Sequence, residues 1–162
     1  MTQPQLQLAP RLASARPDEL VQQLRLMQAS ETDSQAKLAA LFHRTQWLPL
    51  RLELLDQRKE TTRQVERLGS LLAMVDGPAA RPIGPVLEWL VERGRAAQLP
   101  AAAIVVGPLR LVRAAIASYR AALATATARG LGYAANLLAN SLAEKTKTNE
   151  RLMALAVAIS DQ

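Results

Sequence analysis

The sequence contains no cysteine and only one histidine, His43, among its 162 residues. Disulfides and thiol chemistry are therefore excluded, and nothing supports an oxidising compartment. A zinc or haem site would have to rely on carboxylates alone, which is not how proteins hold these groups. We therefore expect no metal and no cofactor. His43 lies beside Phe42 and near Trp47 at helical spacing, which is typical of a surface or half-buried histidine.

The motifs of catalysis are also lacking. No glycine-rich phosphate loop follows a strand pattern, because the glycines stand beside prolines or alone in helical segments. The acids mostly lie at helical spacing beside Arg or Lys, as in 53–60, which is typical of a solvated helix face. No nucleophile is paired with a base. The sequence predicts a protein without enzymatic activity.

Targeting and membrane-spanning signals are weak. The first 17 residues lack the charged start and continuous apolar stretch of a signal peptide. The longest uncharged apolar run, 96–109, contains two prolines and is too short to span a bilayer. These features predict a soluble cytoplasmic protein with no membrane span.

Acidic residues are absent from 93–143, although this segment carries six arginines and the whole chain has a net charge of +6. Arg110, Arg113 and Arg120 fall on one helical stripe, which could bind phosphates. Aromatic residues make up 3% of the chain, and the segment has no lysine, so base stacking has little support. A solvated amphipathic helix face has the same pattern. A nucleic-acid-associated or phage assembly protein that uses 93–143 is therefore the alternative to the protein-binding function that the C-terminal helix suggests below.

The first half of the chain predicts a helical hairpin over 17–75. Pro17, followed by two acids, is typical of a helix start, and Pro49 ends one helix and suits the first turn of the next. Leucines at helical spacing form one stripe in each helix, interrupted by Glu31 in the first and Lys59 in the second. Because both lie about four turns from the bend, we expect Glu31 and Lys59 on facing helices.

The second half predicts further helices after a linker at 76–85, where glycine and proline concentrate. A short apolar helix is expected at 86–99, and an alanine-rich helix over 101–129, kinked at Gly107-Pro108. Glycines at 130 and 132 lead into the last helix. The fold class is therefore all-α: an elongated antiparallel bundle with long first, second and C-terminal helices. It forms one domain, 17–162, behind a flexible tail, 1–16.

The C-terminal helix carries an apolar seam in heptad steps that meets Lys145 and Asn149 before it resumes at Leu152. A break would need glycine or proline, and 133–162 contains neither. Two interpretations remain. A polar layer inside the bundle would set the register of the helices, whereas an open groove would bind an amphipathic helix of a partner. A homo-oligomeric scaffold, with polar layers between identical chains, is a further possibility.

The order of hairpin, linker and final helix resembles the FlgN-like family of flagellar export chaperones. The similar stretches are 31–68, with Glu31 and Lys59 in comparable places, and the asparagine-leucine pairs at 136–142 and 149–155. The resemblance implies a cytoplasmic chaperone that binds the C-terminal amphipathic helices of hook-filament junction proteins. The partner-binding residues carried over from the family are Leu138, Leu142, Asn149, Leu152 and Ile159.

Overall fold

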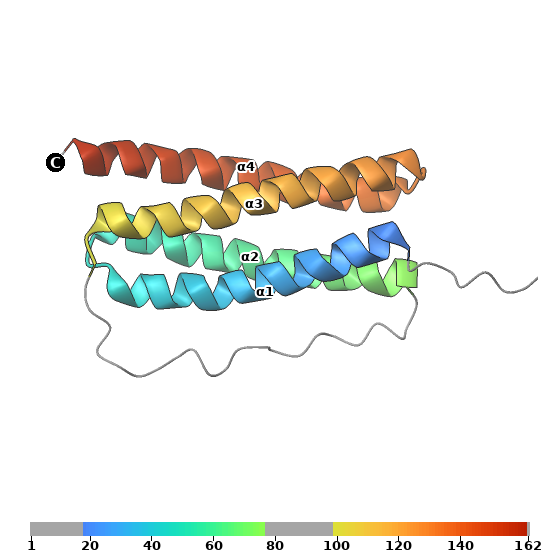
Figure 1. Ribbon diagram of the computed structural model, residues 1–162, viewed down its shortest axis with the longest axis horizontal. Helices are drawn as coiled ribbons and strands as arrows, with labels where there is room; N and C mark the ends of the chain where they lie inside the picture. The colour runs from blue at the N-terminus through green and yellow to red at the C-terminus, as the bar shows by residue number, and fades with distance from the viewer. Residues whose placement is uncertain (1–17, 77–98, 162) are drawn as a thin grey trace, which may run out of the picture.

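The computed structural model describes residues 18–76 and 99–161, which form four helices and, within these ranges, no strand (Figure 1). The helices are α1 (Glu19–Arg44), α2 (Leu48–Asp76), α3 (Ala101–Ala128) and α4 (Gly132–Ser160). The predicted all-α bundle is confirmed. The predicted tail, nearly all of the linker and the short helix at 86–99 fall outside the described residues.

Local sequence signals explain the helix ends. Asp18 caps α1: its carboxylate accepts a hydrogen bond of 3.0 Å from the Leu20 amide, and Glu19 in the first turn favours the positive end of the helix dipole. Thr45 is extended after α1, and Pro49 lies in the first turn of α2, where a missing amide hydrogen costs nothing. The predicted break near Pro49 is confirmed.

Two glycines lie at notable positions in the second pair of helices. Gly130 has φ of 68°, a left-handed conformation that ends α3 and turns the chain into α4. Gly107 lies where α3 faces α1, and a Cβ there would make an ordinary contact of 3.4 Å with the Leu41 Cδ1 atom. α3 continues through Pro108 without leaving the helical state.

The helices pack as a four-sided bundle in which α1 lies beside α2 and α3, and α4 lies beside α3 and α2. All adjacent pairs are antiparallel. Asp18 before α1 pairs with Arg129 after α3, and the Leu99 amide before α3 donates to the Arg44 carbonyl at the end of α1. Arg25 pairs with Asp76, so α2 ends where α1 begins. α2 therefore ends at the opposite end of the bundle from where α3 begins (Figure 1).

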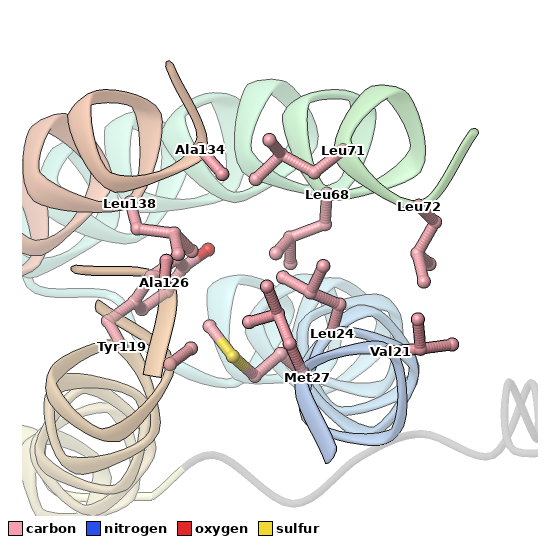
Figure 2. Close-up of a cluster of buried hydrophobic side chains, with 12 residues drawn as sticks. Val21, Leu24, Met27, Leu68, Leu71, Leu72, Tyr119, Ala126, Ala134 and Leu138 are labelled. Atoms are coloured by element: carbon pink, nitrogen blue, oxygen red, sulfur yellow. The ribbon is translucent and has the colours of Figure 1, made fainter. Parts of the chain in front are cut away.

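Two apolar clusters fill the ends of the bundle. Figure 2 shows the first, in which Leu24 and Leu68 meet Tyr119 and Leu138 from the opposite helix pair. The second cluster is formed around Leu38, Leu50, Leu54, Ile104, Val105, Val112 and Leu152. Fully burying such a side chain contributes about 1.5–3 kcal/mol. The middle of the bundle, between these clusters, is polar.

Glu31 and Lys59 lie on adjacent antiparallel helices, as expected, but they do not share one polar layer. Lys59 is exposed and pairs with Asp56 on its own helix. The inward stripe of α2 contains Gln57, Thr61 and Gln64 between its leucines, so apolar periodicity alone misplaced the inward face in the first half of the helix. Leu52 and Leu55, which a stripe of leucines alone would turn inward, are exposed, whereas Leu68 and Leu72 are buried.

Candidate functional site: the polar centre of the bundle

A buried ion pair occupies the centre of the bundle. The Lys145 ammonium on α4 donates a hydrogen bond of 2.8 Å to the Glu31 carboxylate on α1, which lies diagonally across the bundle. The two side chains are only 4% and 3% exposed. A second contact, of 3.4 Å, reaches the Thr61 hydroxyl on α2. Removing both charges from water is costly, and their mutual neutralisation offsets much of that cost.

Several oxygen atoms around this pair have no hydrogen-bond partner among the described residues. Buried side-chain oxygens of this kind are normally satisfied by protein groups or by internal water. The four that belong to the centre and its neighbouring turns are Glu31 Oε1, Gln57 Oε1, Gln64 Oε1 and Tyr119 OH. The centre thus holds more acceptor atoms than the ion pair uses.

Tyr119 supplies the α3 side of the centre. Burial raises the pKa of its hydroxyl far above the ordinary value, and the Glu31 charge adds to this effect. The Ser141 hydroxyl lies beside it, but the Tyr119 hydroxyl has no hydrogen-bond partner among the described side chains. Because its pKa is raised so far, the phenol stays protonated at neutral pH. It cannot act as a base at neutral pH.

Two half-buried ion networks close the side of the bundle between α2 and α4. In one, Glu144 accepts hydrogen bonds from Arg67 at 2.8 Å and Gln64 at 3.0 Å. Burial opposes ionisation of Glu144, but these donors outweigh it and hold its pKa below the ordinary value.

The other network joins Arg151 on α4 to Glu53 at 2.9 Å and to Glu60 at 3.1 Å, both on α2. The Thr148 hydroxyl also donates to Glu60, at 2.7 Å. Here burial prevails, and the pKa of Glu53 is raised above its ordinary value despite Arg151. Both networks join α2 to α4, and the carboxylates of Glu53, Glu60 and Glu144 are all paired within them.

The described part of the chain offers little room for a small ligand. A shallow groove of about 280 Å³ between α2 and α4 is lined by Arg63, Glu66, Arg67, Ser70, Tyr133 and Leu137. Ligand pockets are usually larger and more enclosed. Within residues 18–76 and 99–161, no group of three His, Asp or Glu side chains is placed to hold a metal ion.

The residues predicted to bind a partner belong largely to the protein's own core. Leu138 and Leu152 are completely buried, one in each apolar cluster, while Leu142, Asn149 and Ile159 are partly buried. Lys145 is buried as well. Of the two interpretations of the C-terminal seam, the structure therefore shows the internal polar layer.

The three arginines proposed as an anion site, Arg110, Arg113 and Arg120, are exposed on α3. The Arg113 guanidinium contacts the Met153 sulfur on α4 at 3.1 Å, so it partly covers the junction between these helices. No acidic side chain on α3 neutralises this group, because the helix contains none.

Sequence analysis missed most members of the polar centre. Thr61, Ser141 and Thr148 were not singled out, although Thr61 contacts Lys145 and the other two lie four residues before and three residues after it on α4. Comparing the depths at which polar residues interrupt the apolar stripes of the four helices would have grouped these residues. Small polar residues at helical spacing are otherwise common on solvated faces.

The fold and sequence match known proteins. Residues 16–162 match the family described as Domain of unknown function (DUF892). A protein from Xanthomonas campestris pv. campestris has a structure with a TM-score of 0.72 and 22% identity, covering 87% of this chain and 90% of that one. The Escherichia coli stress protein YciF has a TM-score of 0.74 and 22% identity, covering 88% and 95%. No curated protein is significantly similar in sequence.

These matches correct the earlier assignment. The FlgN-like resemblance, and with it the flagellar export function, is wrong, because the family match covers nearly the whole chain and its structural neighbours are of the YciF type. The leucine and asparagine spacing that suggested the chaperone recurs in many helical bundles. Nor do the comparisons support the nucleic-acid alternative. The chain belongs to the DUF892 family.

Proposed function

We propose that this protein is a non-enzymatic structural protein of the cytoplasm that self-associates through the outer face of α3. The observation that carries the proposal is a line of exposed small apolar residues on α3, which Arg110 interrupts between Val106 and Ala114. These residues, which we call the alanine face, are Ala103, Val106, Ala114, Ala117, Ala121, Ala124 and Ala128. In the half from Ala114 to Ala128 their spacing alternates between three and four residues, as in helices that pack against a parallel or antiparallel neighbour.

The alanine face is unusual for a helix on the surface. Only 22% of the most apolar 18-residue window of α3 is buried inside the bundle. Large apolar surfaces on a helix are normally covered. By length and composition α3 could also cross a membrane, a property shared by core helices of soluble proteins. The alanine face of a second copy of this chain could cover it without any other protein or a membrane.

A second copy is the partner that fits this chemistry best. Alanine side chains allow two helix backbones to approach closely, and a symmetric dimer brings the same patch of each chain together. The polar centre supports the absence of enzymatic activity, because Lys145 and Glu31 neutralise each other away from solvent. The name of the Escherichia coli neighbour, a stress protein, suggests that the assembly works under stress.

The experiment is a measurement of molar mass in solution by light scattering. We expect a dimer or larger assembly for the wild type and a monomer for Ala117→Glu and Ala121→Glu, which place charges in the alanine face. Ala143→Glu, at an exposed alanine on α4, is the matched control and should leave the mass unchanged. Far-ultraviolet circular dichroism should show equal helix content in all four proteins.

Two results would contradict the proposal. A wild-type protein that stays monomeric up to high concentration would show that the alanine face does not self-associate. A monomeric wild type that co-floats with lipid vesicles, together with an Ala117→Glu variant that does not, would show that a membrane surface covers the face.

A further inference from the structure

The arrangement of inward-facing residues at the centre follows a pattern known from metal-binding bundles. Four-helix bundles with a long crossover connection include carboxylate proteins that hold two metal ions in the core. They use one Glu from each of two helices and a Glu-x-x-His motif, spaced i and i+3, from each of the other two. In this chain, too, α2 ends at the opposite end of the bundle from where α3 begins.

The inward positions at the centre have the same spacing. α1 supplies Glu31, and α3 supplies Tyr119. α2 supplies the fully buried pair Thr61 and Gln64, and α4 supplies the buried pair Lys145 and Thr148, each pair three residues apart. The backbone therefore places buried residues at the spacing of a carboxylate metal site, although Gln64 and Thr148 donate to Glu144 and Glu60 in the networks between α2 and α4.

The side chains themselves do not fit a metal. The centre has one carboxylate, Glu31, where the two-metal bundles have four. It has no histidine, because the only histidine of the chain is His43. Lys145 stands where α4 would provide an acid, and its ammonium nitrogen lies 2.8 Å from Glu31. A positive charge in this position repels any divalent ion.

We infer that the Lys145 ammonium takes the place of a metal ion, so that the centre is a cation site filled by the chain's own charge. The second Glu31 oxygen is buried without a hydrogen-bond partner among the described residues, so it can still accept a hydrogen bond from internal water. The protein then needs no metal for folding, and divalent ions neither bind at the centre nor stabilise it. Exchanging the ammonium for a carboxylate turns the centre toward metal binding.

The test compares the wild type with Lys145→Glu and Lys145→Gln, each with chelator and with Mn²⁺. The readouts are the thermal unfolding midpoint and the amount of Mn²⁺ retained per chain after desalting. We expect no retained Mn²⁺ and no change in midpoint for the wild type. Lys145→Glu, which places a second carboxylate opposite Glu31, should retain Mn²⁺ and unfold at a higher temperature with it. Lys145→Gln removes the charge without adding a ligand and should show neither effect.

Three results would overturn the inference. The first is stoichiometric Mn²⁺ on the wild type that is lost in Glu31→Gln, because Lys145 would then not exclude the metal. The second is a folded Lys145→Glu protein that neither retains Mn²⁺ nor gains stability from it. The third is an equal gain in Lys145→Gln, which would assign the effect to charge alone. If Lys145→Glu does not fold in chelator, folding upon addition of Mn²⁺ supports the inference, and failure to fold with Mn²⁺ counts against it.

Discussion

Lys145 in the middle of α4 and Glu31 in the middle of α1 form a hydrogen-bonded ion pair across the diagonal of the bundle, 114 residues apart in the chain. The two helices do not pack directly against each other, so this pair and the Thr61 hydroxyl join opposite corners through the core. Leucine clusters at both ends exclude water from it. A polar layer in this position fixes which residues of the four helices lie at the same depth.

The pair predicts a contrast between single and double variants. Lys145→Met leaves the Glu31 charge buried without its partner, and we expect a loss of about 3–5 kcal/mol in the free energy of unfolding. Lys145→Met combined with Glu31→Met removes both charges and should recover most of that loss. Chemical denaturation of the three proteins measures these differences. A double variant as unstable as the single one would show that the layer stabilises the fold by more than mutual neutralisation.

Tyr119 provides a second prediction, because its buried hydroxyl has no hydrogen-bond partner among the described residues. Removing a hydroxyl that makes a hydrogen bond usually costs about 0.5–1.5 kcal/mol. Tyr119→Phe should instead leave the free energy of unfolding unchanged or raise it. Tyr133→Phe, at an exposed position on α4, is the control. A clear loss for Tyr119→Phe alone would reveal a bound water or another partner at the centre.

The carboxylate of Asp18 predicts a pH dependence. Its pKa is lowered below the ordinary value of 3.8, chiefly by the hydrogen bond from Arg129. Because the folded pKa is the lower one, the contribution of Asp18 is fully present above pH 3.8 and is lost as the pH falls through the folded value. Arg129→Ala should move the pKa of Asp18 upward, which carbon-detected NMR titration can follow. An unchanged titration would show that the backbone amides of Leu20 and Val21 set the pKa.

How far the sequence could predict this structure differs between the helices. Pro49 and Gly130 mark real helix boundaries, because proline suits a first turn and glycine alone adopts the left-handed turn easily. The inward face of α2 could not be predicted, since Gln57, Thr61 and Gln64 interrupt its leucines and become internal only through partners on α1 and α4. Lys145 was recognised as a polar layer, but its pairing with Glu31 depends on the packing of distant helices.

The network around Arg151 gives the last prediction. Glu53 is almost completely buried, its pKa is already raised by burial, and Arg151 is the donor that favours its ionised form. In Arg151→Met the carboxylate loses that donor, so its pKa should rise further and the free energy of unfolding at pH 7 should fall by about 1–3 kcal/mol.

A raised folded pKa means that Glu53 stabilises the fold most when protonated, and that this contribution is lost as the pH rises through the folded value. The deficit of Arg151→Met should therefore shrink as the pH is lowered toward 4.5, the ordinary pKa of the group. Arg58→Met, an exposed arginine on α2, should show no such trend, and an equal deficit at both pH values would assign the loss to packing of the Arg151 side chain.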